Sequence, residues 1–162
     1  MSSHAEQPSS DRSRGHRATG IVAAVLGVVI VVAVAANTLV ALIAGGLGAN
    51  SGFAPLTPAV YGGFTAVGVI VGWLGWQIVL RRAARPRTVL IVLVPTVTAL
   101  SMVPDLLLLA LRFIPGADTA AVVALMVMHV VVVALAVPGY VIATRLRQPV
   151  AATVTTSVTA AA

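Results

Sequence analysis

The chain has no cysteine and has few charged or aromatic residues. Charged residues make up 9% of its 162 residues and aromatic residues 4%, whereas 59% are hydrophobic. The absence of cysteine excludes disulfide scaffolds, thiolate zinc sites and cysteine nucleophiles. A soluble domain has about 25% charged residues, and a chain this small could not bury so much apolar surface. The composition therefore excludes a soluble enzyme and a disordered chain, and it indicates an integral membrane protein.

Charged residues are missing altogether from long stretches, and these stretches define the expected membrane spans. No charged residue lies between residues 18 and 80, and a segment rich in Gly, Pro, Asn and Ser at residues 45–58 divides this stretch in two. About 20 apolar residues cross the hydrocarbon core as a helix. We therefore expect an all-α membrane protein, a four-transmembrane-helix bundle over residues 19–145. The predicted spans cover residues 20–44, 59–80, 88–111 and 119–143.

Polar or low-complexity residues fill both ends of the chain. Residues 1–18 are polar and serine-rich, and residues 146–162 form a string of Thr, Ala and Val. We predict that both are disordered tails. The first apolar run also resembles a cleavable secretory signal, but signal h-regions are only about 7–15 residues long. Because the run continues to Ile43, we expect it to be retained as a membrane span.

Lysine is absent, and all ten basic residues are arginine. Three precede the first predicted span, four lie between the second and third, and two follow the fourth, whereas Arg112 alone lies at the opposite end. The positive-inside rule then predicts a multi-pass protein of the cytoplasmic (inner) membrane with both termini in the cytoplasm. The cluster between the second and third spans either only fixes the topology or also binds anionic lipid headgroups. It consists of Arg81, Arg82, Arg85 and Arg87.

Small residues recur on one face of the second predicted span. Gly68 and Gly72 form a GxxxG motif, and Thr65 and Gly75 extend it at three-residue spacing. Small residues let two helix backbones approach closely, and this packing is a main source of attraction between helices in lipid. The face therefore serves either packing within the bundle or a homodimer contact.

Asp105 is the most costly residue to place in a bilayer, because an ionised carboxylate at the membrane centre costs about 2.5–3.5 kcal/mol on insertion scales. Thr98 and Ser101 precede it on the same helical face. This polar stripe would point into the bundle if the third span continues to Leu111. Alternatively, Pro104 ends the span and Asp105 caps a short interfacial segment.

His129 lies near the middle of the fourth predicted span. A lone histidine at this depth is usually neutral and hydrogen-bonded to a neighbouring helix. A second interpretation pairs it with Asp105, and such a pair could accept a proton or bind a small cation. Asn37, in the outer half of the first span, either completes this polar cluster or makes a structural hydrogen bond between helices.

The last predicted span resembles that of a known family. The segment AAVVALMVMHVVVVALAVPGY at residues 120–140 is similar to the closing helix of small four-helix bacterial membrane proteins, classed as domain of unknown function 6069. SMVPDLLL at residues 101–108 and GWLGWQIVLRR at residues 72–82 resemble the ends of the family's third and second helices. The resemblance implies the same four-helix layout and no known reaction, cofactor or partner. The residues of the last helix that match are Leu125, Met126, His129, Pro138 and Gly139.

Sequence motifs of common enzyme classes are missing as well. The chain has no HExxH, GxSxG or Walker motif, and no GxGxxG after a strand. We therefore expect no enzymatic activity, cofactor, metal or nucleic-acid partner. The leading hypothesis is a non-catalytic component that acts through helix–helix contacts with itself or a membrane partner. The alternative is a small transporter or channel-like protein with a polar path at Asp105, His129 and Asn37.

Overall fold

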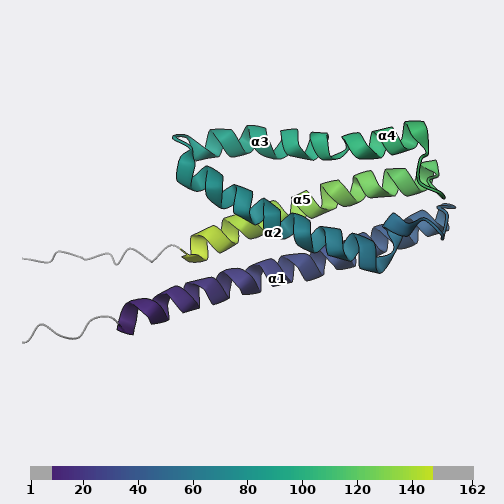
Figure 1. Cartoon of the computed structure of the whole chain (residues 1–162). Coiled ribbons are helices and arrows are strands. Elements are labelled where there is room, and N and C mark those ends of the chain that lie inside the picture. Colours follow the sequence, from purple (N-terminus) through teal and green to yellow (C-terminus); the bar gives the residue numbers. More distant parts are fainter. Residues whose placement is uncertain (1–8, 148–162) are drawn as a thin grey trace, which may run out of the picture.

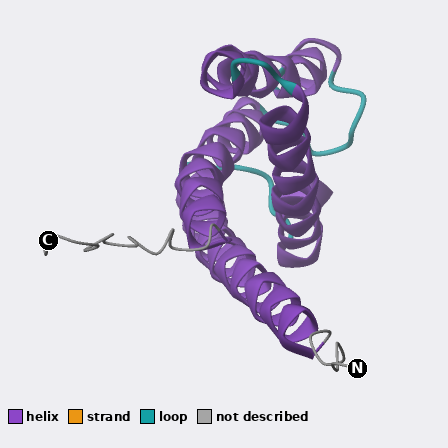
Figure 2. Ribbon diagram, turned by 90° about the vertical axis from the view of Figure 1, so that its left-hand side faces the viewer, coloured by secondary structure: helices purple, strands orange, loops and turns teal. Residues whose placement is uncertain are grey.

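The computed structural model describes residues 9–147, and these residues form helices joined by short loops (Figures 1 and 2). Within this range there is no strand. Four helical stretches are long and apolar enough to cross a membrane, which confirms the predicted all-α, four-span architecture. The elements are α1 (Ser9–Gly46), the short 3₁₀ helix η1 (Ala54–Leu56), α2 (Pro58–Arg82), α3 (Pro86–Ser101), α4 (Val103–Leu111) and α5 (Thr119–Arg147).

The first helix begins well before the predicted span. The prediction of a disordered tail over residues 1–18 is wrong for residues 9–18, because α1 already begins at Ser9. Once the apolar helix has formed, each further residue adds a hydrogen bond without a new nucleation cost, so the helix extends into polar sequence. At the other end, α5 continues to Arg147. The remaining parts of both predicted tails lie outside the described residues.

The third predicted span consists of two helices separated by a break at Met102. The Met102 N–H donates to the Ala99 carbonyl at 3.2 Å, which is a tighter turn than an α-helix makes. Pro104 lies in the first turn of α4, where its missing N–H costs no helical hydrogen bond. Both alternatives for this span hold in part, because the span continues to Leu111 but its helix is interrupted just before Pro104.

The main contact of the bundle runs between α1 and α5, which lie along each other (Figure 1). Small residues allow this approach. A Cβ atom added at Gly139 would overlap with the Val29 side chain. Ala33 on α1 and Ala143 on α5 are completely buried. The closeness of the two backbones supplies the dispersion contacts that hold helices together in lipid.

Tyr140 fastens α5 to α2. Its hydroxyl donates a hydrogen bond to the Val69 carbonyl at 2.7 Å. Its ring centroid lies 5.7 Å from those of both Trp73 and Trp76. Trp76 Nε1 in turn donates to Thr144 Oγ1 at 3.2 Å. These contacts fix how α2 and α5 are turned relative to each other.

By contrast, α3 is the least packed of the spanning helices. None of its residues is buried, and only 6% of the most apolar window of Pro86–Leu111 lies inside the protein, against 28% for α5. Figure 1 shows α3 and α4 along one side of the bundle. The outer surface of α3 is therefore open to lipid or to another helix.

Candidate functional site

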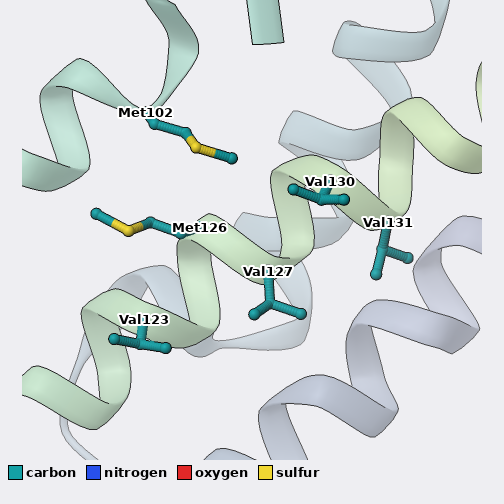
Figure 3. Close-up of a pocket in the computed structure, with 6 residues that line it drawn as sticks. All are labelled: Met102, Val123, Met126, Val127, Val130 and Val131. Atoms are coloured by element: carbon teal, nitrogen blue, oxygen red, sulfur yellow. The ribbon is translucent and has the colours of Figure 1, made fainter. Parts of the chain in front are cut away.

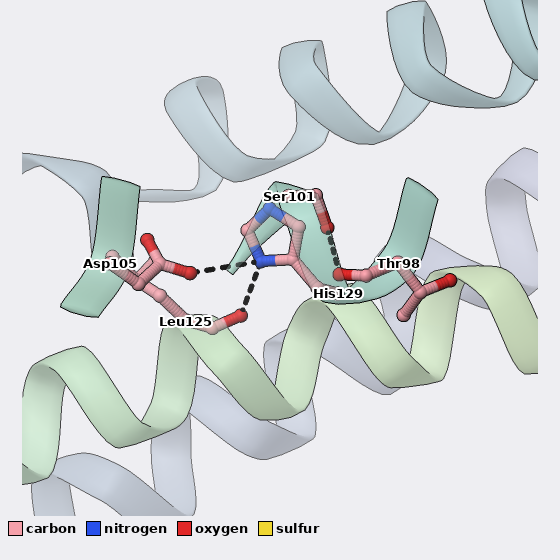
Figure 4. Close-up of polar contacts among 5 residues, drawn as sticks. All are labelled: Thr98, Ser101, Asp105, Leu125 and His129. Atoms are coloured by element: carbon pink, nitrogen blue, oxygen red, sulfur yellow. Dashed lines mark hydrogen bonds and ion pairs between the residues drawn. The ribbon is translucent and has the colours of Figure 1, made fainter. Parts of the chain in front are cut away.

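Asp105 on α4 and His129 on α5 lie next to each other within the spanning part of the chain. His129 Nδ1 is 3.3 Å from Asp105 Oδ2 and 2.8 Å from the Leu125 carbonyl oxygen (Figure 4). The Asp105 side chain is 10% exposed and that of His129 38%. The structure thus brings together the two ionisable residues that the sequence places inside the membrane.

The break in the third span determines the position of Asp105. Asp105 lies in the first turn of α4, directly after the break. The unpaired N–H groups at a helix N-terminus carry a partial positive charge, which stabilises a nearby carboxylate. A continuous helix would offer no such compensation at this depth. The interruption therefore lowers the cost of an ionised Asp105 in the bilayer.

The histidine ring is held on one side and free on the other. With its hydrogen on Nδ1, the ring donates to the Leu125 carbonyl, the nearer of the two oxygens. Asp105 Oδ2 is then left in electrostatic contact with the ring but without a hydrogen bond. Nε2, on the other side of the ring, has no hydrogen-bond partner among the described residues.

Thr98 and Ser101 satisfy their hydroxyl groups within their own helix. Thr98 Oγ1 donates to the Val94 carbonyl at 2.8 Å. Ser101 Oγ donates to the Thr98 carbonyl at 2.7 Å, as Figure 4 shows. Each hydroxyl thus uses its proton on the backbone of α3, as is common for Ser and Thr in membrane helices. The residues of the predicted polar stripe thus make no hydrogen bond to Asp105 or His129.

Asn37 does not join the pair, and the predicted three-residue cluster must be corrected. Asn37 Nδ2 donates to Thr65 Oγ1 on α2 at 3.0 Å, and both residues are buried. The hydroxyls of Thr38 and Tyr61 lie 2.8 Å apart and link the same two helices. Asn37 therefore makes a structural contact between α1 and α2, because the rotation of α1 turns it towards α2.

The residues of the predicted small-residue face of α2 also do not share one contact. Thr65 binds Asn37, and a Cβ atom at Gly72 would overlap with the Tyr140 hydroxyl. A Cβ at Gly68 or Gly75 would meet nothing within 4 Å in the described structure. The buried stripe of α2 follows every fourth residue and thus turns away from Gly68 and Gly75. Gly72 thus packs within the bundle, whereas Gly68 and Gly75 make no such contact in the described structure.

A second small-residue seam, on α5, was missed by the sequence analysis. Ala136, Gly139 and Ala143 are buried and form the contact with α1. Their spacing of three and four residues is the same signal as on the second span. The signal was present in the sequence, but alanine is so common in this chain that the seam does not stand out.

The arginines gather at one end of the bundle. Figure 1 shows that both ends of the described chain and the turn between α2 and α3 lie at this end. Arg81 and Arg82 lie in the last turn of α2, where the negative end of the helix dipole favours a cation. Arg145 and Arg147 occupy the same position on α5. The cluster formed by Arg81, Arg82, Arg85 and Arg87 is therefore extended by the end of α5.

At the opposite end, Asp118 joins two loops. Its Oδ1 accepts a hydrogen bond from the Ala121 N–H and its Oδ2 one from the Asn50 N–H, both at 2.7 Å. These backbone hydrogen bonds, that from Ala121 above all, hold the pKa of Asp118 below its usual value, and the charge of Arg112 adds to the effect. Asp118 thus caps α5 and ties its start to the loop after α1.

An apolar groove opens beside the break in the third span, between Met102 and α5 (Figure 3). Its volume is about 270 Å³, and only carbon and sulfur side-chain atoms line it. The groove therefore offers an apolar surface but no hydrogen-bonding group. The lining residues are Met102, Val123, Met126, Val127, Val130 and Val131.

A family model described as a family of unknown function (DUF6069) matches residues 9–148. The chain belongs to this family. The match includes every helix described above, and it confirms the family that the sequence resembles. No curated protein and no solved structure matches the chain.

Proposed function

We propose that the protein is a non-catalytic membrane component that acts through helix–helix contacts made by the outer face of α3 and the adjoining groove on α5. The observation that carries this proposal is the poor packing of α3, which has no buried residue. Its apolar side chains are widely exposed, including Ile91 at 74% and Leu100 at 65%. The partner is an apolar membrane helix, from a second copy of the chain or from another protein.

The groove supports the same proposal. Lipid tails are as apolar as the groove, so the hydrophobic effect does not favour a helix there. A helix of fixed shape, however, gains dispersion contacts in the groove that a disordered acyl chain makes less well. The groove between Met102 and Val130 therefore favours a helical occupant over a lipid.

Filling the groove tests this proposal. Val127→Trp places a large side chain in the groove, whereas Val31→Trp places one on exposed α1 as a matched control. We expect native mass spectrometry from a mild detergent to show an oligomer or a complex for the wild type and the control, and a monomer for Val127→Trp. Identical assemblies for both variants would contradict the proposal.

The distribution of the arginines supports a location in the cytoplasmic membrane with both termini in the cytoplasm. Nine of the ten arginines lie in the segments that this orientation assigns to the cytoplasm. Reporter fusions after residue 50 and at the C-terminus test it. We expect activity of a periplasmic reporter only after residue 50, and a periplasmic C-terminus would contradict the orientation.

A second candidate function is transport of a proton or small solute past Asp105 and His129. Interrupted helices that carry charged groups within the membrane are typical of transporter binding sites, and the break at Met102 favours this candidate. We expect Asp105→Asn to abolish a pH-dependent flux in liposomes, and Asp118→Asn, outside the span, to leave it intact. No flux in the wild type would remove this candidate.

A further inference from the structure

We propose that Asp105 and His129 together form a binding site for one proton, located at the break of the third span. This inference goes beyond both proposed functions, because proton binding at equilibrium requires neither a partner helix nor a flux. It rests on the contact between the two side chains, the free ring nitrogen and the absence of other charges nearby.

The hydrogen bonds define where the proton binds. His129 Nδ1 carries a hydrogen that it donates to the Leu125 carbonyl, so the lone pair of Nε2 is the free acceptor. When Nε2 is empty, the neutral imidazole and the Asp105 carboxylate carry a net charge of −1. When Nε2 takes up a proton, an imidazolium faces a carboxylate at 3.3 Å and the net charge is zero. One proton enters, and no covalent bond between heavy atoms changes.

No charged side chain in the apolar parts of the neighbouring helices compensates the charge of this pair. On α3 and α4, Asp105 is the only titratable residue between Arg87 and Arg112, and on α5 His129 is the only one between Asp118 and Tyr140. The apolar part of α1, Thr19–Gly46, has none. An uncompensated charge in hydrocarbon is expensive, and the dipole of α4 offsets only part of it. Uptake of one proton removes the net charge of the pair from these apolar surroundings.

The titratable groups of α2 do not contribute to the site either. The spanning part of α2 has Tyr61, whose hydroxyl is engaged with Thr38, and its arginines lie at the opposite end of the helix from Tyr61. No titratable group on a neighbouring helix thus shares the proton.

The site fits a proton better than a metal ion. Structural zinc sites use four protein ligands and catalytic zinc sites use three. Within the described residues, no group of three or more His, Cys, Asp or Glu side chains could hold a metal. The pair also lies towards the end of the bundle opposite the arginine cluster, since α4 runs only about 9 Å beyond Asp105 at 1.5 Å per residue. The site is exposed at His129, whose side chain is 38% exposed.

Proton uptake by the purified full chain tests the inference. The chain has three histidines, so His4→Gln and His16→Gln are introduced in every sample to isolate His129. The α-amino group also binds protons between about pH 8 and about pH 5, so uptake in this range is measured as the difference from His129→Gln. We expect the background to take up one proton per chain more than His129→Gln. We expect this additional proton to be absent in Asp105→Asn and present in the matched control Asp118→Asn.

Infrared difference spectra of the unsubstituted pair provide a measurement that does not depend on a folded variant. The carboxylate band of an aspartate and the ring bands of the histidine should change in the same pH step. Separate steps, no step, or an unchanged uptake in a folded Asp105→Asn variant would overturn the inference. If the wild type shows no flux in liposomes but still takes up the proton, transport is rejected and the proton site stands.

Discussion

Asp118 Oδ2 accepts a hydrogen bond from the Asn50 backbone N–H at 2.7 Å, across a separation of 68 residues. The same carboxylate caps α5 through Ala121. One charged side chain therefore joins the loop after α1 to the start of the last span. Gly116 supports this contact, because its φ of +80° turns the chain against Asn50 and is easily adopted only by glycine.

This contact predicts that acid destabilises the protein. The pKa of Asp118 is lowered in the folded state, chiefly by the hydrogen bond from Ala121. The folded protein then binds fewer protons at this site than the unfolded chain, so its contribution is complete above the ordinary pKa of 3.8 and is lost as the pH falls through the lower folded value. We expect thermal unfolding in detergent to show this loss, and Asp118→Asn to remove it. An identical pH profile for the variant would contradict the prediction.

Gly72 and Gly68 are predicted to tolerate substitution very differently. Gly72→Leu forces a side chain into Tyr140, and overpacking of this kind typically costs about 1–3 kcal/mol. Gly68→Leu enters open space, so we expect little change in the melting temperature. The smaller change Gly72→Ala should be rescued in part by Tyr140→Phe, which removes the hydroxyl that the new Cβ meets. Equal effects at Gly72 and Gly68 would show that α2 and α5 are not packed as described.

Asn37 and Thr65 are predicted to be coupled. Each of Asn37→Ala and Thr65→Val removes the hydrogen bond between α1 and α2, and such bonds are worth about 0.6–2 kcal/mol in membranes. A double-mutant cycle measured by unfolding in detergent should therefore give a coupling energy in this range. A cycle between Asn37 and Asp105 is the control, and we expect no coupling there. Coupling of Asn37 to Asp105 instead would restore the polar path predicted from the sequence.

The sequence predicts the number of spans well because lipid leaves few choices. A backbone in hydrocarbon must satisfy its own hydrogen bonds, so long apolar stretches become helices. The ends of these helices are less certain, since hydropathy does not report a helix that extends into polar sequence, as α1 does at Ser9. Pro104 marks a discontinuity in the sequence, but only the structure shows that the span continues beyond it.

The candidate site could be predicted only in part. Depth along each span places Asp105 and His129 within reach of each other. The rotation of a helix about its axis, however, depends on packing with its neighbours, which the apolar surface of these helices hardly encodes. For this reason the position of Asn37 against Thr65, and of Gly72 against Tyr140, became clear only from the structure.

The central claim is that the exposed face of α3 contacts another membrane helix. Cross-linking in native membranes tests this claim most directly. Because the chain has no cysteine, a single introduced cysteine reports on one position only. Val92 on α3 is 62% exposed and Val28 on α1 is 64% exposed, so Val92→Cys and Val28→Cys form a matched pair. We predict that oxidation cross-links Val92→Cys to a second copy or to a partner and leaves Val28→Cys monomeric. Equal cross-linking at both positions, or none at Val92→Cys, would contradict the account.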